Sequence, residues 1–251
     1  MEENVGKLGI IDFFNVLFAG CIFIIGFLWL FPCFLEFYDD FKYYYEKEAY
    51  VVIIILAFFI GLILQEFGSF LDQKCFHIKS NVIENFLKPN NLREPTKSNE
   101  IIDNDIKFTI YRNHGKRILE NKKIDTKNKD FDEQQCKFIY AYCVYYTESK
   151  GKNGKYEKMR GLFDLSRTLI GVNFVLGCLA FFKCLLSIFL WEDVCCLWFS
   201  TGQMFIFGLI VCIFYKRAEK IMNYKARMLM EVYDICVEND NGDCIENNEG
   251  R

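Results

Sequence analysis

Apolar residues are concentrated in two blocks, about 8–71 and 162–215, and each block holds two runs long enough to cross a bilayer. The four runs cover about 8–35, 49–71, 162–186 and 197–215. A transmembrane helix needs about 20 mostly apolar residues, because about 30 Å of hydrocarbon is crossed with every backbone polar group bonded inside the helix. The pattern therefore predicts four transmembrane helices in two pairs. A large buried helical core is the alternative, but soluble helices of this length normally keep a polar face.

The segments outside these blocks, 72–161 and 216–251, are charged and typical of protein in contact with water. Helical spacing of apolar residues in 72–161 predicts a mainly helical insert, with a linker at "KPNNLREPTKSNE" and an interruption near Gly115. After residue 215 the pattern predicts a helix followed by an acidic tail. The predicted fold is an all-α integral membrane protein with a cytosolic helical insert between transmembrane helices 2 and 3.

Lysine and arginine predict the orientation, because both are enriched on the cytoplasmic side of membrane proteins. Of 30 basic residues, 19 lie between Lys74 and Arg160, whereas the 36–48 loop holds only Lys42 and Lys47. The loop "WEDVCC" before the fourth run holds no basic residue. We therefore expect a cell-membrane protein with both termini and residues 72–161 in the cytoplasm.

Polar residues at the predicted cytoplasmic ends of three helices form a candidate seam. With helices 1 and 3 running outward and helix 2 inward, six of these residues fall at a similar depth: Asp12, Asn15, Gln65, Glu66, Asp164 and Arg167. Ionisable groups are costly to leave unpaired in hydrocarbon, and a guanidinium can serve two carboxylates, so Arg167 is the predicted hub. Three interpretations stay open: groups that reach the wet interface, a structural clamp, or an ion or proton pathway.

Other polar residues lie within the apolar runs themselves. Asn173 and Gln203 are expected to hydrogen-bond to other helices, either to hold helices together or to line a pore. Lys183 lies deep in the third run and is expected to extend its ammonium group toward the outer interface. Ala57 and Gly61 are small residues that allow close helix packing, in a monomeric bundle or in an oligomer.

Sequence motifs for chemistry are absent. Two histidines stand far apart, the 12 cysteines include no C-x-x-C, and no phosphate-binding or nucleophile-elbow motif is present. We therefore expect no enzyme activity and no catalytic, metal-binding or cofactor-binding residues. The insert is basic, but its lysines are interspersed with acids, which favours anionic lipid head groups over nucleic acid.

These observations favour a non-enzymatic multi-pass membrane protein, an effector or channel-like protein whose cytosolic insert receives a signal or a partner. A membrane anchor or scaffold for a cytosolic partner is one alternative, and a small intramembrane lipid-modifying enzyme is another. The expected partners are membrane lipids, further copies of the chain and a cytosolic protein.

Overall fold

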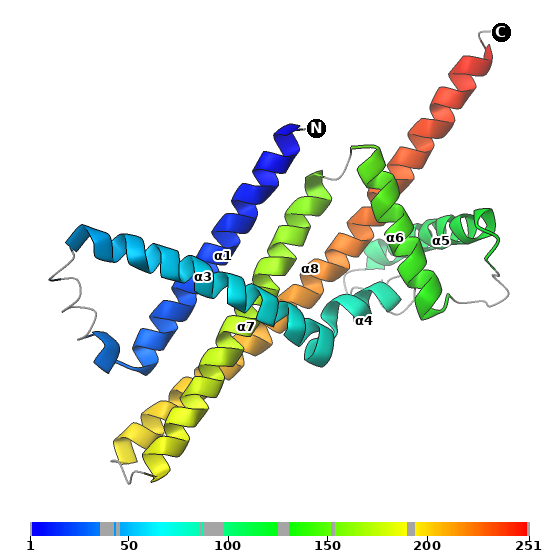
Figure 1. Cartoon of the computed structure of the whole chain (residues 1–251). Coiled ribbons are helices and arrows are strands. Elements are labelled where there is room, and N and C mark those ends of the chain that lie inside the picture. Colours follow the sequence, from blue (N-terminus) through cyan, green and yellow to red (C-terminus); the bar gives the residue numbers. More distant parts are fainter. Residues whose placement is uncertain are drawn as a thin grey trace. The chain divides into compact units, whose positions relative to one another are not determined.

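The computed structural model describes residues 2–35, 43, 46–85, 87, 98–124, 131–151, 154–189 and 194–249, and the regular elements in these ranges are all helical (Figure 1). The elements are α1 (Glu2–Leu30), α3 (Glu46–Leu71), a π-helical turn (Asp72–Phe76), α4 (Ile78–Asn85), α5 (Ser98–Asn121), α6 (Glu133–Ser149), α7 (Gly154–Phe189) and α8 (Val194–Glu249). Helices α1, α3, α7 and α8 each contain a stretch long and apolar enough to cross a membrane. The predicted all-α fold with four membrane-spanning helices is confirmed.

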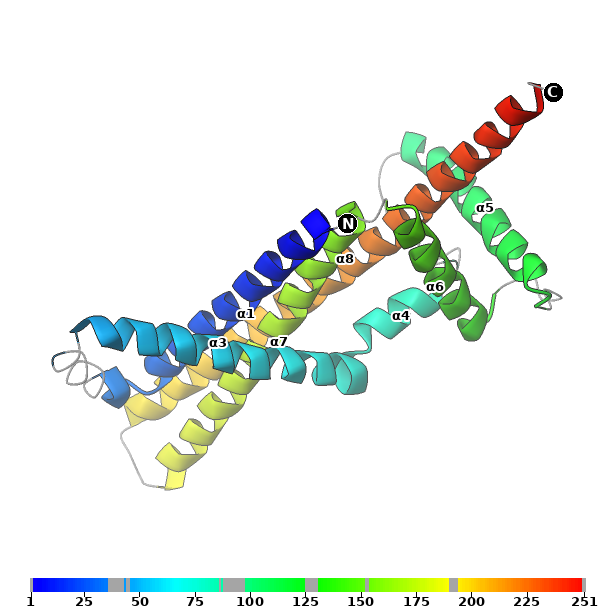
Figure 2. The same ribbon diagram turned by 45° about the horizontal axis from the view of Figure 1, so that its top comes forward.

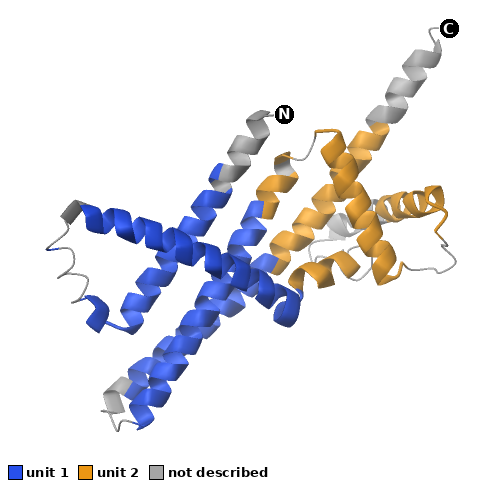
Figure 3. Ribbon diagram, viewed as in Figure 1, with its two compact units in different colours: residues 1–77, 161–218 blue, residues 78–160, 219–251 orange. Residues whose placement is uncertain are grey.

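The chain divides into two compact units (Figure 3). Unit 1 comprises Met1–His77 and Gly161–Ala218, and unit 2 comprises Ile78–Arg160 and Glu219–Arg251. Helices α7 and α8 contribute residues to both units, whereas α1 and α3 belong to unit 1 and α4, α5 and α6 to unit 2.

Several helix ends differ from the predicted ones, and each difference has a local cause. Helix α1 ends at Leu30 rather than near residue 35, because Pro32 has no N–H and cannot continue a helix. Helix α3 ends at Leu71 as predicted, and the π-helical turn after it stops at His77, whose φ of 52° is left-handed.

Helices α7 and α8 both extend beyond their predicted membrane-spanning stretches, as the helical patterns of residues 155–167 and 215–238 indicate. Helix α7 begins at Gly154, ahead of the predicted start at 162, and α8 continues through the expected acidic tail to Glu249. The interruption expected near Gly115 is wrong, because α5 runs through it. Gly115 faces Phe131 and Ile139 so closely that a methyl group there would lie 3.2 Å from both side chains.

In unit 1 the helices alternate in direction (Figures 1 and 2). Close backbone approaches pair α1 with α3 in opposite directions, and further contacts pair α1 with α7 in the same direction and α7 with α8 in opposite directions. The pairs are Val16–Gly61, Gly20–Ala57, Gly26–Leu176, Gly177–Phe207 and Cys184–Thr201. The core of unit 1 is apolar and is formed by Ala19, Leu30, Leu64, Val172, Leu176, Ala180 and Phe207.

Unit 2 has its own core, in which α6 packs on the part of α8 that belongs to this unit. Cys136, Ile139 and Cys143 of α6 and Met222 of α8 have no exposed surface. The start of α6 is fixed by a capping box, in which Asp132 accepts from the Gln135 backbone N–H at 2.7 Å and the Gln135 side chain accepts from the Asp132 N–H at 3.0 Å.

Candidate functional site

The charged pair that opens the third apolar stretch lies within α7. Arg167 Nη2 lies 3.1 Å from Asp164 Oδ1, one helical turn away, and the guanidinium lies 5.7 Å from the ring centroid of Phe163. The two side chains are 15% and 23% exposed. The Nε atom of Arg167 is buried and has no hydrogen-bond partner among the described residues. The arginine is thus held by one carboxylate and one ring, with part of its donor capacity unused.

Helices α1 and α3 both contact α7 near this pair. Asn15 of α1 donates from Nδ2 to the carbonyl oxygen of Gly161 at 3.3 Å. Gly68 of α3 lies against the backbone of Arg167, since a methyl group at Gly68 would lie 2.7 Å from the Arg167 carbonyl oxygen. In the region around Gly161–Arg167, α7 therefore contacts both α1 and α3.

The other residues of the predicted seam do not join the guanidinium. Gln65 is half-buried, whereas Asp12 and Glu66 are exposed, and in the part of the chain that the structure describes neither carboxylate makes a hydrogen bond or ion pair. Asp72, which the sequence analysis did not select, is 3% exposed. Asp72 could have been identified from its spacing in the sequence. It follows Leu64 and Gly68 at intervals of four residues, and both belong to the buried face of α3.

A second polar cluster, which we call the α1 end cluster, lies where α1 stops. Lys183 of α7 donates from Nζ to the Leu30 carbonyl oxygen at 2.6 Å, and Gln203 of α8 donates from Nε2 to the Trp29 carbonyl oxygen at 3.1 Å. The last four carbonyls of a helix have no partner within it, and these are two of them. The chain turns at Pro32, so donors from neighbouring helices replace those that a longer helix would supply.

The lysine of this cluster is also held by aromatic rings. Its ammonium nitrogen lies 5.9 Å from the ring centroids of Phe31 and Phe199. A cation at a helix C-terminus is further stabilised by the helix dipole. Lys183 was expected to extend its ammonium group toward the outer interface; its contact is the carbonyl of Leu30 at the end of α1, so it caps that helix.

The two intramembrane amides behave differently. Gln203 is 1% exposed and bonds to another helix, whereas Asn173 donates to the Leu169 carbonyl of its own helix at 2.8 Å. Gln203 Oε1 and Ser200 Oγ are buried without a hydrogen-bond partner among the described residues. Gln203 therefore links α8 to α1 and retains one unused acceptor.

Unit 2 contains a separate group of titratable side chains. His114 Nε2 of α5 lies 2.6 Å from Asp234 Oδ1 of α8. The Cys143 thiol lies 3.6 Å from the sulfur of Met230, and burial raises its pKa to about 12. Burial and the neighbouring Tyr156 raise the pKa of Tyr140. A raised thiol pKa disfavours the thiolate, so Cys143 has the character of a core residue and not of a nucleophile.

Within the described ranges, no group of three or more His, Cys, Asp or Glu side chains could hold a metal ion. Comparison with protein-family models, with curated proteins and with solved structures found no match. The fold and the two polar clusters of unit 1 are thus the basis for a functional assignment.

Proposed function

We propose that this multi-pass membrane protein is a non-enzymatic membrane effector. In this proposal unit 2 receives a signal or a protein partner in the cytoplasm, and unit 1 responds by a change of assembly or permeability. Both termini and residues 72–161 would face the cytoplasm, as the distribution of basic residues predicts. The observation that carries the proposal is that α7 and α8 each run without a break from a membrane-spanning stretch into unit 2.

Continuous helices are suited to such a role because they are stiff. A Gly- or Ser-rich linker absorbs movement as a flexible coil, whereas a helix keeps its rise of about 1.5 Å per residue and moves as a rod. Repacking of α6 against α8 in unit 2 would therefore act on a helix that also carries Gln203. Movement of α7 would act on Arg167 and Lys183 in the same way.

The packing of unit 1 supports a response that involves more than one copy. The seven residues that form its core are all apolar, which favours an ion pathway between copies over one through that cluster. Asp12 and Glu66 are exposed near the ends of their apolar stretches. Ionisable side chains at membrane depth normally face protein or water, so their exposure favours association of further copies.

The proposal is tested by measuring potassium and proton leak from cells that express the full chain. Lys220 is an exposed residue of α8 next to the boundary between the units, and Lys220→Pro breaks the helix there by removing its bond to the Lys216 carbonyl. We expect leak from the wild type, retained by Lys220→Ala and changed by Lys220→Pro with equal membrane insertion. Absence of leak from all three chains, when all are inserted, would exclude the effector function.

The charged residues of unit 1 provide a second arm of the same experiment. Arg167→Ala removes the guanidinium that lies 3.1 Å from Asp164, and Glu66→Gln removes an exposed charge without changing the size of the side chain. A dependence of the leak on these residues would make them part of the conducting or gating element. Unchanged leak in both inserted variants would limit them to a structural role.

A scaffold for a cytosolic partner is the second candidate function. It is favoured by exposed apolar side chains in unit 2, where Tyr145 is 74% exposed and Ile235 is 52% exposed. This function predicts stoichiometric co-purification of one protein that is lost on Tyr145→Ala, with no leak from the wild type. The two functions thus give opposite results in the leak assay.

A further inference from the structure

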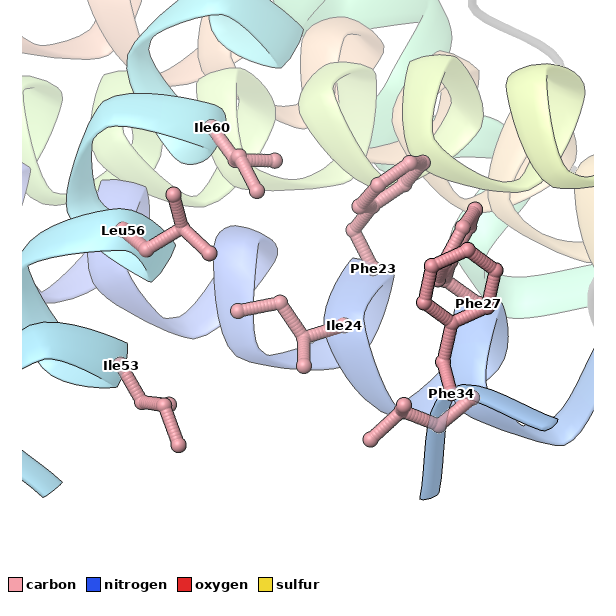
Figure 4. Close-up of a pocket in the computed structure, with 8 residues that line it drawn as sticks. Phe23, Ile24, Phe27, Phe34, Ile53, Leu56 and Ile60 are labelled. Carbon is pink, nitrogen blue, oxygen red and sulfur yellow. The ribbon is translucent and has the colours of Figure 1, made fainter. Parts of the chain in front are cut away.

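A hollow of about 480 Å³ lies between α1 and α3 in unit 1 (Figure 4). Its lining is made only of apolar side chains, which include Phe23, Ile24 and Phe27 of α1 and Ile53, Leu56 and Ile60 of α3. These residues all lie within the membrane-spanning stretches Asp12–Leu30 and Glu48–Phe76. Phe34, which follows the end of α1, also lines the hollow and packs on Phe27 with ring centroids 5.3 Å apart.

The hollow results from the way in which α1 and α3 cross. Where they meet, both helices carry small residues, and a methyl group at Gly20 or Gly61 would overlap the carbonyl oxygen of Ala57 or Val16. Beyond this crossing, toward the Leu30 end of α1, the facing residues are Phe, Ile and Leu. Bulky side chains cannot maintain so close an approach, and the space between the helices widens.

The chemistry of the lining decides what fills this space. A water molecule in an enclosed site needs two to four polar partners, and none of the lining side chains carries a polar atom. An empty space would deprive the lining atoms of dispersion contacts. Around the membrane-spanning stretches the surrounding medium is hydrocarbon, so an acyl chain is the apolar filler that is always available.

We propose that this groove between α1 and α3 holds an acyl chain of a membrane lipid as a bound ligand. A second copy of the chain fits less well, because a helix with its side chains is about 10–12 Å wide and the helices enclosing the groove are in backbone contact at one end. A volume of 480 Å³ falls within the range of sites for small molecules, about 300–1,000 Å³. The bound chain is held by packing, since its transfer from bulk lipid gains no hydrophobic free energy.

The experiment uses the full chain in phosphatidylcholine vesicles that contain a small fraction of phosphatidylcholine with a diazirine in its acyl chain. After illumination, the labelled residues are mapped by peptide mass spectrometry. We expect at least threefold more label in Phe23–Phe27 and Ile53–Ile60 than around Ile213, which is 55% exposed and lies outside the groove. Labelling that follows side-chain exposure alone would overturn the proposal.

A matched pair of variants tests occupancy of the groove directly. Leu56→Trp fills it, whereas Ile63→Trp enlarges an exposed residue of the same helix outside the lining; the original side chains are 51% and 69% exposed. Native mass spectrometry of the detergent-purified chains is expected to show one retained lipid on the wild type and on Ile63→Trp, and at least fivefold less on Leu56→Trp. Equal retention by both variants, or ready disulfide-linked dimers of Leu56→Cys in membranes, would refute a lipid occupant.

Discussion

Lys183→Met tests whether the lysine in the third apolar stretch holds α1 in place. The substitution removes a hydrogen bond from an ammonium group to the Leu30 carbonyl, at 2.6 Å, and leaves that carbonyl without its donor. Hydrogen bonds to charged groups contribute about 1.5–3 kcal/mol in soluble proteins, but bonds between membrane helices average about 0.6 and reach about 1.7 kcal/mol. The dipole of α1 adds about 0.3–1 kcal/mol. We therefore expect Lys183→Met to lower the free energy of unfolding by about 1–3 kcal/mol.

The direction of the change in stability distinguishes two roles for Lys183. If Lys183 simply lay in hydrocarbon, its replacement by methionine would favour insertion, because a lysine at the centre of a membrane helix costs about 2.5–3.5 kcal/mol. The assay is reversible unfolding of the purified chain in mixed micelles by increasing SDS. Lys216→Met, at an exposed residue of α8, is the control. A Lys183→Met chain as stable as this control, or more stable, would refute the capping role.

Two further predictions concern packing and cysteine reactivity. Gly61→Leu is expected to separate α1 from α3, because even a methyl group there would overlap the Val16 carbonyl; Gly208→Leu, which meets open space, should have little effect on SDS unfolding. Cys143 is expected to resist alkylation in the folded chain at pH 8 while exposed Cys75 reacts. The raised pKa of Cys143 also stabilises the folded state fully below about pH 9, the ordinary value, and this contribution falls as the pH rises toward 12. Equal labelling of the two cysteines in folded protein would contradict the burial of Cys143.

The sequence was sufficient to predict the four membrane-spanning helices, because length and continuous apolarity are imposed by the bilayer itself. Helix α3 ends at Leu71 as predicted, since Asp72 and the polar residues after it follow the apolar run directly. Apolar residues continue beyond the end of α1 to Leu35, so the apolar pattern alone predicts an end about five residues too late. A proline without an N–H decides the helix end even when apolar residues continue beyond it.

Features that depend on contacts between helices could not be predicted from the sequence pattern. Gly115 suggested a break in α5, but the absence of a side chain there allows Phe131 and Ile139 to pack against the helix. The sequence of α5 alone does not contain the information that these two residues lie nearby. The role of Lys183 depended on where α1 stops, so it could be found only once Leu30 and the lysine were placed together. Membership of the charged seam was predicted from depth alone, and depth does not say which way Asp12 or Glu66 faces around its helix.

The polar contacts of α1 restrict how unit 1 could respond to unit 2. Asn15 and Leu30 are both bonded to α7, and they are about 22 Å apart along α1 at about 1.5 Å per residue. Apolar packing, including that of Gly26 against Leu176, lies between these two bonds. A helix pair fastened at both ends and packed between them resists separation more than it resists rotation as one body. Movement transmitted along α7 would therefore carry α1 with it, and the proposed response would arise by rearrangement between copies of unit 1 and not by opening a gap between α1 and α7.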